Sequence, residues 1–136
     1  MRFFLDNCIS PRYAQSLHIL SEKDGHSVIH LQEKFPRDSP DEVWLRGLGT
    51  EGDWVIISGD TRILSKRALR DEWARTRLTA FFLANVYGNA RYWDQIGFLM
   101  RWWPNILEQA RLVERGTGFE VPYRMSGRLK PIFSRR

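Results

Sequence analysis

The chain has almost no cysteine and no long apolar run, and both absences restrict what it can be. Its single cysteine, Cys8, among 136 residues cannot form an internal disulfide and cannot build a zinc site alone. No apolar stretch approaches the roughly 18–20 residues needed to span a bilayer. The N-terminus also lacks the basic and apolar regions of a signal peptide. We therefore expect a protein of a reducing, cytoplasmic location with no membrane segment.

Internal repeats, low-complexity stretches and a second domain are absent as well. A composition of 43% hydrophobic and 13% aromatic residues is that of an ordinary folded protein, which excludes a disordered chain. The length lies in the commonest range for one domain. We expect a single domain over residues 1–124 and a basic, loosely ordered C-terminal tail over 125–136.

The formal charge of +5 is spread unevenly along the chain. Residues 1–68 hold nine Lys/Arg and ten Asp/Glu, whereas residues 69–136 hold twelve and six. Acids that could hold a metal ion therefore lie in the first half, and the basic surface lies mainly in the second. A basic field attracts polyanions such as nucleic acid, although moderate basicity is also common in cytosolic proteins without that role.

Apolar runs that alternate with helical patterns predict an α/β fold built on a mainly parallel sheet of about five strands. Ser10 as N-cap and Pro11 at the first helical position predict one helix start. Gly47 and Gly49 suggest that the helix beginning at Asp41 ends early, after packing through Val43, Trp44 and Leu48. The expected strands cover 2–6, 27–31, 54–58, 78–84 and 119–123. The expected helices cover 11–23, 41–48 and 89–114, with a partly helical connector over 63–75.

Three acids stand at comparable positions beside these elements. Asp6 ends the first apolar run, Asp41 opens a helix, and Asp60 follows the buried run Val55–Ile57. Carboxyl ends of parallel strands are where open α/β sheets bind their ligands. The first and third strands can be neighbours there, with the helix start at Asp41 or its neighbour Glu42 above them.

Three converging carboxylates would repel one another unless a cation neutralised them. Mg²⁺ and Mn²⁺ prefer carboxylate and water oxygens, and such an ion can activate a water for attack on a phosphodiester. Each acid also has a structural interpretation. Asp41 suits the positive end of its helix dipole, Asp60 suits a turn, and Asn7 suits the turn after Asp6. Asp6 is harder to explain this way, because a buried strand seldom ends on an unpartnered acid.

The stretches Leu5-Asp6-Asn7, Ser39-Pro40-Asp41-Glu42 and Ile57-Ser58-Gly59-Asp60 resemble the acidic pattern of the PIN-like nuclease superfamily. The aromatic segment from Tyr92 to Pro104 resembles its compact branch of VapC-type toxins. No single motif is specific, and the order and spacing over about residues 1–123 carry the resemblance.

The resemblance implies a three-layer α/β/α fold and a metal-dependent ribonuclease held in check by a cognate antitoxin. Matched residue by residue, the catalytic and metal-binding acids of the family fall on Asp6, Asp41 and Asp60, with Mg²⁺ or Mn²⁺ as the ion. Many PIN domains have a further acid near the last of these, but Thr61 and Arg62 follow Asp60 here. This departure puts a second metal and full activity in doubt.

A basic cluster directly follows Asp60 and is a candidate for holding the RNA backbone. Its members are Arg62, Lys66, Arg67 and Arg70. Arg62 is the strongest candidate because it is closest to Asp60, while a solvated charged face is the simpler explanation for any single one of them. Asn7 and Glu42 are candidates for supporting the acids.

The remaining distinctive residues have ordinary interpretations. The apolar arc of the aromatic helix, which includes Trp93 and Met100, is mostly core. It is wide enough for part of it to form a homodimer or antitoxin interface. The three histidines lack a metal-ligand spacing, and Cys8 is expected to be a small buried residue.

Two other functional classes compete with the ribonuclease. One is a PIN-like module that has lost catalysis and only binds a protein partner or RNA. The other is phosphoryl transfer on a similar sheet. A haloacid-dehalogenase-type phosphatase needs an acid two residues after the first, where Cys8 stands, and a receiver domain needs an acidic pair that Asp6-Asn7 does not supply.

Overall fold

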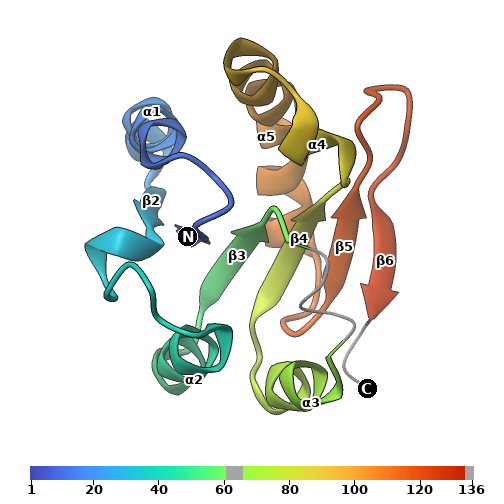
Figure 1. Ribbon diagram of the computed structural model, residues 1–136. Coiled ribbons are helices and arrows are strands. Elements are labelled where there is room, and N and C mark those ends of the chain that lie inside the picture. The colour runs from blue at the N-terminus through green and yellow to red at the C-terminus, as the bar shows by residue number, and fades with distance from the viewer. Residues whose placement is uncertain (61–65, 134–136) are drawn as a thin grey trace.

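A six-stranded sheet lies between two layers of helices in the computed structural model, which describes residues 1–60 and 66–133 (Figure 1). The strand order is β2-β1-β3-β4-β5-β6, in which the first five strands are parallel and β6 is antiparallel. The strands are β1 (Arg2–Leu5), β2 (Ser27–His30), β3 (Trp54–Ser58), β4 (Thr79–Leu83), β5 (Gly118–Val121) and β6 (Lys130–Phe133). The helices are α1 (Pro11–Ser21), α2 (Asp41–Glu51), α3 (Arg67–Arg75), α4 (Val86–Asn89) and α5 (Tyr92–Leu112), with short 3₁₀ helices at Glu22–Asp24 and Leu31–Glu33.

The alternation of side chains along each strand divides the core into two halves. Phe3 and Leu5 of β1 face the layer of α1 and α5, whereas Phe4 between them faces the layer of α2 and α3. Side chains of a strand point alternately to opposite faces, and here both faces are covered. This explains why the central strands are continuous apolar runs, and it confirms the expected three-layer α/β/α architecture.

The beginning of the chain folds as its sequence predicts. The Ser10 hydroxyl accepts a hydrogen bond from the N–H of Arg12 at 3.2 Å, and Pro11 occupies the first turn of α1. Strand β1 lies between β2 and β3, with Leu5 in register with His30 and Ile57. The residues that follow these three positions therefore meet at one edge of the sheet.

Helix α2 does not end early, because its two glycines serve close packing and do not mark a helix end. An added Cβ would lie 3.0 Å from the Phe35 ring at Gly47 and 2.5 Å from the Thr76 methyl at Gly49. These glycines therefore mark close packing rather than a helix end, and α2 continues to Glu51. Val43 was also expected to pack, but its side chain is exposed.

The expectation of a loosely ordered tail is wrong for β6, which adds a sixth strand beside β5. The Phe133 ring packs against Trp73 and Phe82, with ring centroids 5.8 and 6.4 Å apart. Pro131 lacks an N–H donor, which suits a strand at the edge of a sheet. The strand was missed because three of its four residues are exposed, so it shows no apolar alternation.

The aromatic helix is shorter than expected because the separate turn α4 precedes it. Phe98 and Trp102 of α5 are buried against the sheet, as predicted. Trp93 is 79% exposed and Met100 is 39% exposed, so part of the arc does face solvent. Within the described residues, no helix has both the length and the apolar character needed to cross a membrane.

Candidate active site at the carboxyl edge of the sheet

Asp6 lies directly after β1, and its side chain is held by groups from two strands. Its carboxylate accepts a short hydrogen bond from the Ser58 hydroxyl at the end of β3. The N–H groups of Cys8 and Gly59 donate to its Oδ1 at 3.1 and 3.4 Å. Only 4% of Asp6 is exposed. The edge of the sheet therefore fixes this carboxylate in one orientation.

Burial dominates the electrostatics of Asp6. Loss of hydration raises the pKa of the Asp6 carboxyl to about 6, against the lowering effect of its three hydrogen bonds. The nearby charge of Asp41 contributes a small part of this rise in the pKa. Among the described residues, no Lys or Arg forms an ion pair with Asp6. At neutral pH Asp6 thus carries a buried negative charge that no Lys or Arg of residues 1–60 and 66–133 pairs with.

The structure connects the other two acids to Asp6 in different ways. The N–H of Asp60 donates to the Ser58 hydroxyl oxygen at 3.1 Å, so Ser58 bridges Asp6 and Asp60. Asp41 stands in the first turn of α2, and its Oδ1 accepts a hydrogen bond from the Trp44 indole at 3.2 Å. Asp41 thus has a local structural role as well as an electrostatic effect on Asp6.

The three acids share one edge without forming a ready-made ligand set. In residues 1–60 and 66–133, no three His, Cys, Asp or Glu side chains are grouped closely enough to hold a metal ion. Asp6 is buried and fixed, whereas Asp41 and Asp60 are half-buried beside it. Any joint coordination therefore needs the side chains of these acids to move.

The supporting candidates are placed as follows. Asn7 is exposed, and its side chain bonds the carbonyl of Arg37 and the amide of Gln32, which ties the loop before α2 to the turn after β1. Glu42 is exposed in the first turn of α2. Of the two acids in this turn, Asp41 is the one whose charge raises the pKa of Asp6. Arg62 lies outside the described residues.

The basic candidates that the structure does describe stand at the beginning of α3. Lys66 caps this helix, Arg67 is its first residue, and Arg70 follows one turn later. All three side chains are exposed to solvent. They are accessible to a polyanion, and their contact with RNA stays a prediction.

Two residues of this edge were not anticipated as site residues. Ser58 belongs to the stretch Ile57-Ser58-Gly59-Asp60, and its position at the last residue of β3 could have identified it as a site residue. Tyr87 in α4 is 1% exposed, and its hydroxyl has no hydrogen-bond partner among the described residues. Burial raises the pKa of Tyr87, and the charges of Tyr13 and Asp6 raise it further. No sequence pattern marks this tyrosine, because it follows β4 rather than either acid-bearing strand.

A histidine and the cysteine complete the surroundings. His30 is buried at the end of β2, where its Nε2 pairs with the carbonyl of Ile9 at 2.7 Å and its Nδ1 accepts from the N–H of Gln32. Burial lowers the pKa of His30. This agrees with the expected packing role. Cys8 was expected to be buried, but it is exposed because it lies in the turn that leads away from Asp6.

The comparison with protein families agrees with this geometry. Residues 1–85 match the family model described as PIN like domain, and this stretch contains Asp6, Asp41 and Asp60. The chain belongs to the PIN-like domain family. No curated protein and no solved structure gives a significant match.

Membership gives the acidic edge a functional context. PIN-like domains are commonly nucleases, so this chain has a nuclease-type fold. The match ends just after β4, and α5, β5 and β6 lie beyond it. In this PIN-like domain the matched part carries the acids, and the remaining elements extend the sheet and cover one of its faces.

Proposed function

We propose that this PIN-like domain is a metal-dependent endoribonuclease in which Asp6, Asp41 and Asp60 are the catalytic acids. The observation that carries the proposal is Asp6, a carboxylate that is 4% exposed, fixed by three hydrogen bonds and lacking a cationic partner among the described residues. A carboxylate buried without a cationic partner costs stability when it is ionised, which favours a functional role for it. A cation that binds there supplies the compensation.

The donors at this edge fit Mg²⁺ or Mn²⁺ by their chemistry. Carboxylate oxygens suit both ions, and all three proposed ligands are carboxylates. Asp6, Asp41 and Asp60 would hold the ion, with Glu42 as a further acid within the same helix turn. When bound, such an ion polarises a phosphodiester and lowers the pKa of a water.

The chain's own groups prepare the site for this role. Ser58 and the N–H groups of Cys8 and Gly59 keep the Asp6 carboxylate in place, so little reorganisation is needed at that ligand. The helix dipole at the first turn of α2 lowers the repulsion that Asp41 feels. The cations Lys66, Arg67 and Arg70 stand after β3, and Arg62 in the preceding segment is proposed to join them on the RNA backbone.

The biological role that fits best is the toxin of a type II toxin–antitoxin pair, of the VapC-like branch. The tryptophan on α5 that is 79% exposed, Trp93, favours a protein interface on that helix. A cognate antitoxin or a second copy of the chain is the proposed occupant. The site, the partner and a cytoplasmic location together describe an intracellular ribonuclease that needs an inhibitor.

Cleavage of a labelled RNA by the purified chain tests the proposal. We expect cleavage with Mg²⁺ or Mn²⁺ and none with EDTA. Asp6→Asn and Asp60→Asn should each reduce the rate by about 100-fold or more, since even supporting residues of metal sites contribute about 10–100-fold. Asp94→Asn, an exposed acid in the first turn of α5, is the matched control. Cleavage that survives in both variants would reject the assignment of the acids.

Induced expression tests the toxin role separately. Wild type should arrest growth, and Asp60→Asn should not. Equal growth of the two cultures at equal protein levels would count against a toxin even if RNA is cleaved in vitro. A small helix-turn-helix protein encoded beside this chain would support the assignment.

The second candidate is a catalytically inactive PIN-like module that binds a protein or RNA. Two observations favour it: Thr61 and Arg62 stand where many relatives have another acid, and the described acids do not form a ready-made ligand set. Titration with Mg²⁺ and Mn²⁺ followed by NMR separates the two candidates. Unchanged signals near Asp6 and Asp60 favour the binding module, whereas saturable shifts there favour the enzyme.

A further inference from the structure

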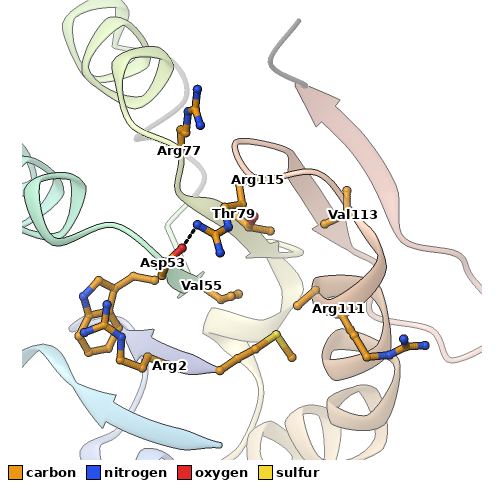
Figure 2. A pocket seen from close by; sticks show the side chains of 11 residues that line it. Arg2, Asp53, Val55, Arg77, Thr79, Arg111, Val113 and Arg115 are labelled. Carbon is orange, nitrogen blue, oxygen red and sulfur yellow. Dashed lines mark ion pairs between the residues drawn. The ribbon is translucent and has the colours of Figure 1, made fainter.

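A cavity of about 420 Å³ opens at the amino ends of β1, β3 and β4, on the edge of the sheet opposite Asp6 (Figure 2). Its volume lies in the lower part of the range of about 300–1,000 Å³ that is typical of small-molecule sites. Val55 and Val113 give it apolar walls, and Thr79 contributes a buried side chain. The cavity is therefore of a size for one small molecule with an apolar part.

Arginines dominate the charge around this cavity. Four of them line it together with one acid, Asp53. Two of the arginines are engaged elsewhere. Arg2 pairs with Glu51 at 3.9 Å and donates to the carbonyl of Gly52 at 2.7 Å. Arg111 pairs with Glu108 at 2.7 Å, and its head group points away from the cavity in Figure 2.

The third arginine, Arg115, pairs with an acid whose backbone conformation is unusual. Asp53 is the one described non-glycine residue with a positive φ, at 64°, and its carboxylate forms an ion pair with Arg115. A left-handed conformation costs a non-glycine residue about 1–2 kcal/mol, although Asp tolerates it better than most. Figure 2 shows the Arg115 head group turned toward Asp53. The left-handed residue thus carries the carboxylate that pairs with Arg115 at this opening.

The fourth arginine has no partner among the residues that the structure describes. Arg77 precedes β4 at the rim of the cavity, where it is exposed and forms no ion pair or side-chain hydrogen bond with a described residue. Its side chain extends from the rim in Figure 2, away from Arg115 and Asp53. No acid of residues 1–60 or 66–133 therefore pairs with this positive charge at the rim.

We propose that this cavity binds a small organic phosphate of about mononucleotide size. The phosphate lies between Arg77 and Arg115, and the apolar part of the ligand lies against Val55 and Val113. A guanidinium binds phosphate oxygens through paired N–H donors, and Arg115 shares its donors between Asp53 and the ligand. This assignment does not depend on the proposed nuclease activity, because the acids lie at the other edge of the sheet.

Calorimetric titration of the full chain in EDTA tests the ligand class. AMP and UMP are the probes, with inorganic phosphate and adenosine as the separated halves of the ligand. We expect saturable binding of the nucleotides, with each half weaker by about tenfold or more. Absence of nucleotide binding at millimolar concentration, or equal binding of adenosine, would overturn the proposal. Equal binding of inorganic phosphate would overturn the role of the apolar walls.

Variants of the rim test the location. Arg77→Gln and Arg115→Gln should each raise the Kd for AMP about tenfold. Asp53→Asn should lower the Kd for AMP. Asn keeps the left-handed backbone, while Arg115 loses the carboxylate that competes with the phosphate. Arg124→Gln, an exposed arginine after β5, is the matched control and should leave the Kd unchanged, as should Asp6→Asn. Wild-type affinity in both rim arginine variants, or weaker binding in Asp53→Asn, would contradict the assignment.

Discussion

The charged side chains at the two ends of β1 and β3 differ in burial and in ion pairing. At the carboxyl ends Asp6 is almost fully buried, is held by hydrogen bonds and has no cationic partner among the described residues. At the amino ends Arg115 and Asp53 form an ion pair in which the side chains are 65% and 53% exposed. Burial makes a single charge expensive, whereas water screens an exposed pair so that it contributes little. The same sheet therefore presents one edge where charge costs stability and another where charge is tolerated.

The largest expected effect on stability comes from removing the buried charge. Burial shifts the pKa of Asp6 from 3.8 to about 6, so ionised Asp6 destabilises the fold at pH 7 by at most about 3 kcal/mol. Asp6→Asn should raise the free energy of unfolding at pH 7 by up to this amount. Urea unfolding in EDTA measures the change. A loss of stability would show that the hydrogen bonds of the carboxylate outweigh its burial.

The pH dependence should follow from the same shift. The folded state binds the Asp6 proton more tightly than the unfolded state, so this group's contribution is fully present below about pH 4 and is lost as the pH rises through about 6. The difference in stability between Asp6→Asn and wild type should therefore grow between pH 4.5 and 7.5. Thermal unfolding of both proteins across this range provides the test, and a constant difference would contradict it.

Ser58→Ala should have the next largest effect. Its hydroxyl donates to the Asp6 carboxylate and lowers the pKa of that group, so its loss should raise the pKa of Asp6 above about 6. Hydrogen bonds to charged groups are worth about 1.5–3 kcal/mol, and the fold should lose about 2 kcal/mol at pH 7. NMR titration of the Asp6 side chain and urea unfolding measure the two effects. An unchanged pKa would remove Ser58 from the site.

Tyr87→Phe should change stability less and in the opposite direction. The Tyr87 hydroxyl is buried without a partner among the described residues, and such groups cost about 1–3 kcal/mol. Its removal should stabilise the fold by about 1 kcal/mol, as measured by urea unfolding. If the variant is less stable, an ordered water satisfies this hydroxyl in the folded protein.

The smallest effect is expected at the amino edge. Arg115→Gln breaks an ion pair between two exposed side chains, and such pairs contribute about 0–1 kcal/mol. The free energy of unfolding should therefore fall by less than about 1 kcal/mol, with an even smaller change at high salt. A loss comparable to that of Ser58→Ala would mean that the two edges do not differ as described.

The regular parts of this fold were accessible from sequence, because their signals are local. Ser10 and Pro11 mark a helix start by their own chemistry, and the run Val55–Ile57 marks a strand buried on both faces. Gly47 and Gly49 misled because their reason lies in Phe35 and Thr76, which are distant in sequence. Helix propensity is a property of the single residue, whereas close packing depends on the residues that contact it in the folded structure.

The candidate site was likewise predictable only in the features that have a local sequence signal. The position of Asp6 at the end of a strand was predictable, and so was its position beside β3. Its pKa, its bond to Ser58 and the orphan hydroxyl of Tyr87 depend on burial, which only the packed structure reveals. The strand β6 was hidden because exposed residues such as Lys130 and Pro131 carry no apolar pattern.

Strand β6 also has a consequence for the order in which the sheet forms. During synthesis on the ribosome, β1 to β5 emerge before Lys130–Phe133, so the outer hydrogen-bonding groups of β5 wait for a partner that is made later. An unpaired strand edge is a site where nascent chains join one another. Once β6 docks, Pro131 pairs with Phe119 and Phe133 fills the space above Gly118. Docking of β6 thus removes the edge of β5 from contact with neighbouring chains.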